Sequence, residues 1–151
     1  MILLRFLLIT LLVTVTLTGC KKNNSTTPVP TTNSQTELLV ANNWLISRVT
    51  TPEGQSISTN RLNLATQVLN QLDMQFRSDN TVRAIDHTSK QIINGGTWTL
   101  APDSKSIDVD VNGFKGNFPI VELSRTKLTL RQRAPVDGKD ADINLEFAPS
   151  I

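Results

Sequence analysis

The stretch Ile107-Asp108-Val109-Asp110-Val111-Asn112-Gly113 decides the fold class of this chain. Apolar and acidic side chains alternate along its first five residues, which is the pattern of a strand with one buried face and one face in water. Asn112-Gly113 follows at once, and such a pair beside alternating apolar residues is the strongest short-range signal for a tight hairpin. The stretch therefore predicts antiparallel strands joined by short turns.

Similar segments lie on both sides of this hairpin at short intervals. Strands are expected at residues 44–50, 74–76, 81–87, 95–100, 107–111, 116–123, 127–133 and 142–147. Turn residues such as Ser78-Asp79-Asn80 and Asp137-Gly138 separate them. About eight sequential antiparallel strands close readily into a barrel, and closure removes the exposed sheet edges. The predicted fold class is all-β, an antiparallel up-and-down barrel of about eight strands.

The segment between the first two strands has a helical period. Its apolar residues follow i, i+3, i+7 and i+10, namely Leu62, Ala65, Leu69 and Leu72. This spacing is the apolar stripe of an amphipathic helix, and Thr59 or Asn60 can cap its N-terminus. We expect one helix over Asn60 to Leu72, between the first and second strands, and no other helix in the mature chain.

Residues 1–19 have the composition of a secretory leader. Arg5 is followed by an apolar run over residues 6–13, the order of charge and apolar residues found in signal peptides. A transmembrane helix needs about 20 apolar residues, whereas Thr14 and Thr16 interrupt this run before Cys20. We therefore predict a cleaved signal peptide over residues 1–19.

The leader ends on Leu17-Thr18-Gly19-Cys20, which contains the only cysteine of the chain. These residues resemble the lipobox of bacterial lipoproteins, with an apolar residue at −3, a small residue at −1 and Cys at +1. The resemblance implies a diacylglycerol on the Cys20 sulfur, cleavage before Cys20 and acylation, for example by palmitate, of the new amino group. Each buried CH₂ would add about 0.8 kcal/mol to membrane anchoring. An ordinary signal peptide with a chance cysteine, or an uncleaved anchor, is the alternative.

Lys21 stands at the +2 position, where an Asp in bacterial families signals retention in the inner membrane. By the same resemblance, the chain is expected at the outer membrane, lipid-anchored and facing the periplasm. Residues 21–36 are polar, with two prolines and Val29 as their one other apolar side chain. Such a segment cannot bury enough surface to fold. We expect a lipidated Cys20 with a disordered tether over residues 20–36, and a folded domain over residues 37–151.

The composition excludes several classes of function. The formal net charge is +2 without a basic stripe, so nothing points to nucleic acid. A single cysteine excludes an internal disulfide and a multi-cysteine metal site. The sequence has no Gly-rich phosphate loop, Gly-x-Ser-x-Gly or His-Glu-x-x-His motif. We therefore predict no enzyme activity, no cofactor and no metal.

Three sets of polar residues have a structural interpretation as well as a chemical one. His87 is the only histidine, and without a partner at motif spacing a surface or packing role is favoured over a general base. Asp108 and Asp110 belong to the wet face of their strand. The acidic residues 137, 140 and 142 match a calcium loop only loosely, and Lys139 interrupts them. A hairpin turn is the better interpretation there.

Three short motifs resemble the lipocalin-like domain of small bacterial lipoproteins. They are Leu38-Leu39-Val40 running into Trp44, Gly96-Thr97-Trp98-Thr99-Leu100 before Pro102-Asp103, and Thr126-Lys127-Leu128-Thr129-Leu130. The similarity covers Leu38 to Phe147 and implies an up-and-down β-barrel. Asn42 stands where lipocalins proper carry the Gly of Gly-x-Trp.

Two functions follow as hypotheses. In the first, the barrel mouth binds a small apolar or amphipathic ligand and the helix gates it. The candidate ligand-binding residues are Trp44, Trp98, Leu62 and Leu69, although tryptophans in a small barrel are more often core. In the second, a non-catalytic accessory or structural envelope protein docks a protein partner, with the barrel filled by its own side chains. Phe114, beside the Asn112-Gly113 turn, is expected to be an exposed contact at the rim.

Overall fold

The computed structural model describes residues 32–150. The predicted signal peptide, Cys20 and the predicted tether up to residue 31 lie outside the described residues. The helical segments are α1 (Thr32–Val40), the 3-10 turn η1 (Thr59–Arg61) and α2 (Leu64–Leu69). The strands are β1 (Asn43–Thr50), β2 (Leu72–Phe76), β3 (Thr81–Asp86), β4 (Ile92–Leu100), β5 (Ser106–Val111), β6 (Phe114–Leu123), β7 (Leu128–Val136) and β8 (Lys139–Ser150).

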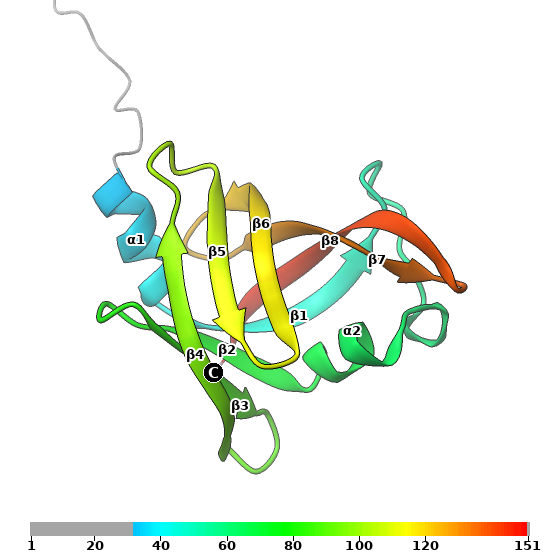
Figure 1. Cartoon of the computed structure of the whole chain (residues 1–151), viewed down its shortest axis with the longest axis horizontal. Helices are drawn as coiled ribbons and strands as arrows, with labels where there is room; N and C mark the ends of the chain where they lie inside the picture. Colours follow the sequence, from blue (N-terminus) through cyan, green and yellow to red (C-terminus); the bar gives the residue numbers. More distant parts are fainter. Residues whose placement is uncertain (1–31, 151) are drawn as a thin grey trace, which may run out of the picture.

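The eight strands form a closed barrel in the order of the sequence (Figure 1). Every neighbouring pair is antiparallel, and β8 closes the barrel by pairing with β1 from Asn43↔Ser150 to Thr50↔Asn144. Closure leaves no strand as an edge of the sheet order. The predicted all-β, antiparallel up-and-down barrel of about eight strands with a helix between the first two strands is confirmed.

The hairpin that decides the fold class behaves as its sequence predicts. Ile107, Val109 and Val111 are buried on β5, while Asp108 and Asp110 between them are exposed. Gly113 has a φ of +83°, which is the left-handed conformation that the Asn-Gly turn requires. The same alternation on the other strands fills the barrel with apolar side chains, among them Trp44, Phe76, Val82, Trp98, Leu128, Leu130, Ile143, Leu145 and Phe147.

The helix predicted over Asn60 to Leu72 is wrong at both ends. α2 begins only at Leu64, because Asn63 is its N-cap and accepts a hydrogen bond from the Thr66 amide at 3.0 Å. Leu62 lies before this cap and forms an isolated bridge with Val136 of β7. Leu72 lies beyond the helix and begins β2. The apolar stripe is therefore shared between a short helix and the two segments beside it.

The sequence also predicts no helix before the first strand, and this prediction is wrong. The helix includes residues 32–36, which the sequence assigns to the end of the tether, whereas the tether before residue 32 lies outside the described residues. α1 begins at Thr32 and contacts β2 and β6. Leu39 of α1 is fully buried, and its carbonyl oxygen accepts the indole N–H of Trp44 at 2.8 Å. α1 therefore covers one end of the barrel, and α2 lies at the opposite end (Figure 1).

Candidate functional site: an apolar cleft at the α2 end

The barrel wall is incomplete where α2 lies. β6 and β7 pair only from Ile120↔Leu130 to Leu123↔Leu128, with a bulge after Ile120. β6 nevertheless continues to pair with β5 as far as Phe114, and β7 with β8 as far as Val136. The two strands therefore separate toward the α2 end, and each has a stretch with no strand partner on that side among the described residues.

The segment before α2 fixes the helix to this opening. The Asn63 amide donates to the Pro135 carbonyl at 3.3 Å, and the Asp137 amide donates to the Arg61 carbonyl at 2.8 Å. Arg61 also forms an ion pair with the Asp137 carboxylate at 2.7 Å. These contacts place the end of η1 and the residues up to Asn63 along the side of β7 that has no strand partner, which positions α2 across the mouth of the barrel.

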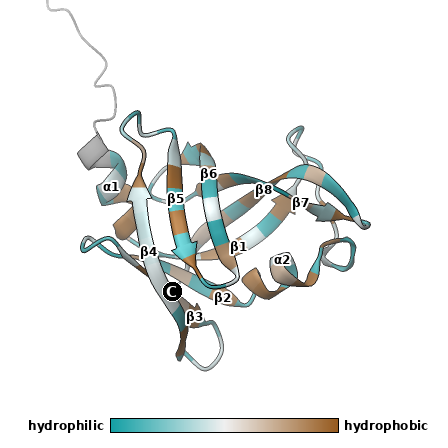
Figure 2. Cartoon of the chain, in the orientation of Figure 1, coloured by the Kyte–Doolittle hydropathy of each residue, from teal (hydrophilic) through white to brown (hydrophobic). Residues whose placement is uncertain are grey.

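An apolar cleft of about 410 Å³ lies between α2, the start of β4 and the β5–β6 hairpin. Its lining residues are Leu64, Ala65, Val68, Leu69, Leu72, Met74, Ala84, Ile93, Asn94, Val111, Asn112, Gly113 and Phe114. Figure 2 shows hydrophobic colour on α2 and at the start of β4. The cleft joins the buried core through Leu69, Leu72 and Met74.

Three aliphatic side chains at this cleft are open to solvent. Leu64 is 74% exposed, Ile93 55% and Val68 42%. Single exposed apolar residues are ordinary, but several around one concave surface mark a binding site or an interface. A ligand or partner that covers the cleft would therefore bury this exposed apolar surface.

A second, more polar pocket of about 290 Å³ adjoins the cleft where β6 and β7 separate. The two cavities share Ala65, Leu69, Gly113 and Phe114 as lining residues. The rest of the polar pocket is lined by Asn63, Thr66, Lys115, Gly116, Asn117, Phe118, Gln132, Arg133, Ala134 and Pro135. Both cavities therefore open at the same end of the barrel, on either side of a common wall.

Phe114 forms part of that wall, which corrects its prediction as an exposed rim contact. Its side chain is buried and stacks on Phe118, with ring centroids 4.4 Å apart and an interplanar angle of 16°. Phe114 lies next to the Gly113 turn, as expected. Its burial depends on Phe118, which follows four residues later along β6 and lies on the same face.

Of the four candidate ligand-binding residues, the structure brings Leu69 to the cleft, where it lines both cavities. Leu62 is buried beside Val136. Trp44 is buried toward α1 with its N–H bonded to Leu39. Trp98 is buried with its N–H donated to the Arg77 carbonyl at 3.0 Å and its ring edge-on to Phe76. Both indoles thus have core contacts and satisfied polar groups.

Sequence reasoning missed Ile93 and Asn94 as site residues, because residues 89–94 have no clear strand pattern. Leu64 and Val68 carry a weak signal, since they widen the apolar stripe of the predicted helix beyond the face that α2 buries. Leu64 and Val68 remain exposed because α2 is short and lies over the mouth of the barrel.

A buried carboxylate fixes the loop that precedes β4. Asp73 on β2 is only 2% exposed, and its oxygens lie 2.9 Å from Nδ1 of His87 and 3.3 Å from Nζ of Lys90. Burial opposes the charged form, but hydrogen bonds from His87, Ser150 and Lys90 outweigh it and hold the pKa of Asp73 below its usual value. His87 thus has a carboxylate partner that the sequence spacing does not reveal, and the pair holds the β3–β4 loop against β2.

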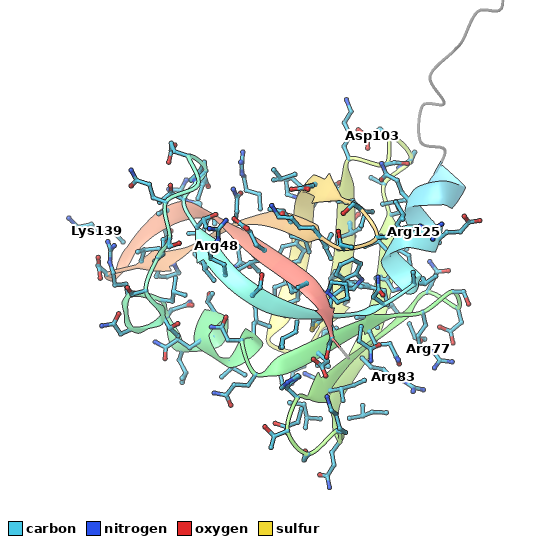
Figure 3. All side chains as sticks on the ribbon, turned by 180° about the vertical axis from the view of Figure 1, so that it is seen from behind. Arg48, Arg77, Arg83, Asp103, Arg125 and Lys139 are labelled. Atoms are coloured by element: carbon cyan, nitrogen blue, oxygen red, sulfur yellow. The ribbon has the colours of Figure 1, made fainter. Side chains whose placement is uncertain are left out.

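A second charged cluster lies on the outer wall of the barrel. Glu146 of β8 forms an ion pair with Arg48 at 2.9 Å and accepts a hydrogen bond from Thr50 at 3.0 Å. Burial raises the pKa of Glu146, but the hydrogen bonds from Arg48 and Thr50 and the charge of Lys127 lower it overall. Arg48 stands on the outside of the barrel in Figure 3. The cluster joins β1 to β8 and lies apart from the cleft.

Within residues 32–150, no three His, Cys, Asp or Glu side chains are grouped so that they could hold a metal ion. In the same part of the chain, no helix has the length and apolar character needed to cross a membrane.

No protein-family model matches the chain, and no curated protein matches it. A solved structure described as a lipocalin-like protein from Bacteroides uniformis ATCC 8492 is similar to it at 14% sequence identity and a TM-score of 0.49. The match covers 73% of this chain and 97% of that chain. A likeness at this level carries no argument about function, and the strand order of this chain establishes its fold without it.

Proposed function

We propose that this chain is a non-catalytic, membrane-anchored lipoprotein whose barrel binds a small apolar or amphipathic ligand in the cleft beside α2. The supporting observation is an apolar cleft of about 410 Å³ with Leu64, Val68 and Ile93 exposed around it. Its volume falls within the range of small-molecule sites, roughly 300–1,000 Å³. Covering these three exposed aliphatic side chains would contribute about 1 kcal/mol each, to which burial of the ligand's own apolar surface adds.

The ligand is expected at the mouth of the barrel rather than deep within it. Toward α1 the interior is filled by large side chains such as Trp44, Trp98 and Phe147, all of them buried. Eight-stranded barrels have room for one small ligand or for their own side chains, and this one uses its own side chains at the α1 end. The buried Leu69, Leu72 and Met74 would form the floor of the site.

The alternative is an accessory or structural envelope protein that docks a protein partner. The filled interior favours it, and so does Ile92, which is 56% exposed beside Ile93 and extends the apolar surface beyond the cleft lining. In that case the same surface would be covered by a protein side chain rather than by a free ligand.

The proposed location rests on the lipobox-like residues 17–20 and the lysine at position 21. Acyl chains on Cys20 would anchor the chain at the outer membrane, with the barrel in the periplasm. The first described element is α1, at the end of the barrel opposite the cleft (Figure 1). An anchor upstream of α1 would therefore leave the α2 end free to meet a ligand.

The test uses the chain from residue 20 onward with Cys20→Ser, which retains every described residue. Fluorescence titration with the neutral probe N-phenyl-1-naphthylamine should show saturable binding. Val68→Glu should weaken it at least tenfold, because a carboxylate would be desolvated in the apolar cleft, and about 1.4 kcal/mol corresponds to a factor of ten.

Val121→Glu is the matched control. Val121 is 48% exposed, close to the 42% of Val68, but it lies on β6 away from the cleft lining. Probe affinity should be unchanged in this variant. Equal losses in the two variants, or no probe binding by the parent chain, would overturn the ligand proposal, and the second result would favour the docking alternative.

A further inference from the structure

We propose that the free edge of β6, at the opening between β6 and β7, binds an extended segment of a partner protein as an added strand with acidic side chains on its outer face. Such strand addition is a recurring way to bind a peptide, because main-chain hydrogen bonds supply affinity and alternate side chains supply specificity. The added strand would lie at the polar pocket of about 290 Å³ between the two strands. The site is separate from the apolar cleft, and the proposal does not depend on the proposed function.

The main chain of β6 has hydrogen-bonding groups that face the opening. In an antiparallel pair, the main-chain groups of successive residues point alternately to the two sides of a strand. The Ile120 amide donates to the Lys105 carbonyl on the β5 side at 2.8 Å, so Phe118, two residues earlier, also bonds toward β5. Lys115 and Asn117 therefore turn their main-chain groups toward the opening, where no strand of the described barrel pairs with them.

The facing edge of β7 is less available than the edge of β6. The Pro135 carbonyl already accepts a hydrogen bond from the Asn63 amide, and proline has no amide hydrogen to donate. Pro119 limits β6 in the same way, so the stretch of β6 with free amide donors ends before it. An added strand would therefore bond to Lys115 and Asn117 and lie beside β7 without pairing with it.

The inner side of the added strand would meet buried aromatic rings. Phe114 and Phe118 of β6 line the pocket and are buried. On the β7 side the inward residue is Gln132, because it pairs with the fully buried Ile143 and cross-strand partners share a face. Valine suits the inward positions of the partner segment, since it favours strands and would pack on the two phenylalanine rings.

The outer faces of the strands alternate in charge across the opening. Lys115 of β6 forms an ion pair with Asp110 of β5 at 2.8 Å. On the other side, Nε of Arg133 on β7 lies 3.9 Å from a carboxylate oxygen of Asp140 on β8. The order across this part of the sheet is therefore acidic, basic, opening, basic, acidic. An acidic side chain on an added strand would lie between Lys115 and Arg133, and opposite charges on neighbouring strands stabilise a sheet.

The same charges argue against two other occupants of the opening. A second copy of this chain that paired through its own β6 would place another lysine-bearing strand beside the basic side chains. Residues 21–31 of this chain have two lysines, two prolines and no acidic residue, and proline lacks the amide that strand pairing needs. An acidic segment of a different protein is the occupant that fits.

The register of the added strand gives the proposal a sharp test. Residues directly opposite each other on paired strands share a face. The partner residues that bond to the main chain of Lys115 and Asn117 are therefore the outward, acidic ones. The main-chain groups of the inward residues point away from β6, because hydrogen-bonding direction alternates along a strand. Removing an amide hydrogen from an acidic residue should thus cost more affinity than removing one from an inward residue.

The experiment measures fluorescence anisotropy of the fluorescein-labelled peptide Glu-Val-Glu-Val-Glu with the chain from residue 20 onward carrying Cys20→Ser. The peptide should bind saturably, and Lys-Val-Lys-Val-Lys should bind at least tenfold more weakly. N-methylation of the central glutamate amide should weaken binding about fivefold, the effect of one lost hydrogen bond of about 1 kcal/mol. N-methylation of a valine amide is the matched control and should change the affinity less than about twofold, since that amide makes no hydrogen bond to β6.

Protein variants test the charges. The double variant Lys115→Gln, Arg133→Gln should bind the glutamate and lysine peptides with similar affinity. Lys139→Gln, at the tip of the β7–β8 hairpin (Figure 3), removes a positive charge that does not line the pocket, and it should retain the full preference for the glutamate peptide.

Three results would count against the proposal. Absence of saturable binding of the glutamate peptide would overturn it. Equal losses on methylation of the glutamate and valine amides would show that the peptide does not pair with β6 as a strand. A preference for the glutamate peptide that survives the double variant would overturn the position given to the acidic side chains. Binding of N-phenyl-1-naphthylamine in the cleft is measured separately, so these results leave the proposed function standing.

Discussion

At the scale of single residues, Gly96 shows how closely β4 and β5 approach. A Cβ built on Gly96 would lie 1.9 Å from the main-chain oxygen of Asp110, which is far inside any contact distance. Gly96→Ala therefore forces the two strands apart, and we expect a loss of about 1–3 kcal/mol or more in the free energy of unfolding. Urea denaturation followed by circular dichroism measures it.

The neighbouring glycine provides the control. A Cβ on Gly95 would have only the Val82 oxygen near it, at an ordinary 3.5 Å. Gly95→Ala should therefore cost well under the loss seen for Gly96→Ala. Similar unfolding midpoints for the two variants would show that β4 and β5 can separate without penalty, contrary to the contact in the structure.

At the scale of the elements, Asp73 couples the β3–β4 loop to β2 through His87 and Lys90. Its pKa is lower in the folded chain than the usual value of 3.8. The folded state therefore binds fewer protons than the unfolded state as the pH falls through this range. The stabilisation is complete at pH values well above 3.8 and is lost as the pH falls through the lowered pKa of the folded chain.

We expect Asp73→Asn to lower the free energy of unfolding more at pH 7 than at pH 3, because pH 3 lies below the usual pKa of 3.8 and the parent chain has there lost part of the contribution of the Asp73 charge. Lys90→Met keeps the carboxylate and should give a smaller difference in the same direction. Urea denaturation at the two pH values tests both variants. A loss in Asp73→Asn that is the same at pH 3 and pH 7 would contradict this role of the carboxylate.

The elements also show where sequence patterns stop being informative. Alternation along residues 107–111 predicts β5 correctly, because the alternation of buried and exposed side chains can be read from the residues of that strand alone. The apolar spacing from Leu62 to Leu72 does not predict the ends of α2. Asn63 is the N-cap, so Leu62 lies before the helix, and Leu72 is the first residue of β2. α1 depends on the contact of Leu39 with Trp44, and no pattern within residues 32–40 indicates that contact.

At the scale of the whole molecule, the barrel follows from local patterns, but the candidate site does not. Sequential hairpins are enough to predict eight antiparallel strands. The opening between β6 and β7 depends on which residues pair across the barrel, and the inward direction of Gln132 depends on its register with Ile143. Of the four ligand-binding candidates, Leu69 lines the cleft, because helical spacing alone does not say which end of the barrel the helix covers.

The two ends of the barrel also have different surroundings in the proposed function. α1 is the described element nearest in sequence to Cys20, and the cleft lies at the other end (Figure 1). We expect the full-length chain to fractionate with membranes and to incorporate palmitate. Cys20→Ala should abolish the labelling and leave an unprocessed or soluble form, because a thiol is the nucleophile that the lipid transfer needs.

Lys22→Ala is the control, since it lies outside the lipobox-like residues 17–20 and should leave labelling and fractionation unchanged. The barrel residues are the same in both variants, so N-phenyl-1-naphthylamine should bind a released Cys20→Ala chain as tightly as it binds the Cys20→Ser chain. Membrane fractionation and palmitate labelling that persist in Cys20→Ala would refute the lipid anchor. The protein would then be held at the membrane by another feature, and the role of the cleft beside α2 would have to be explained for that mode of attachment.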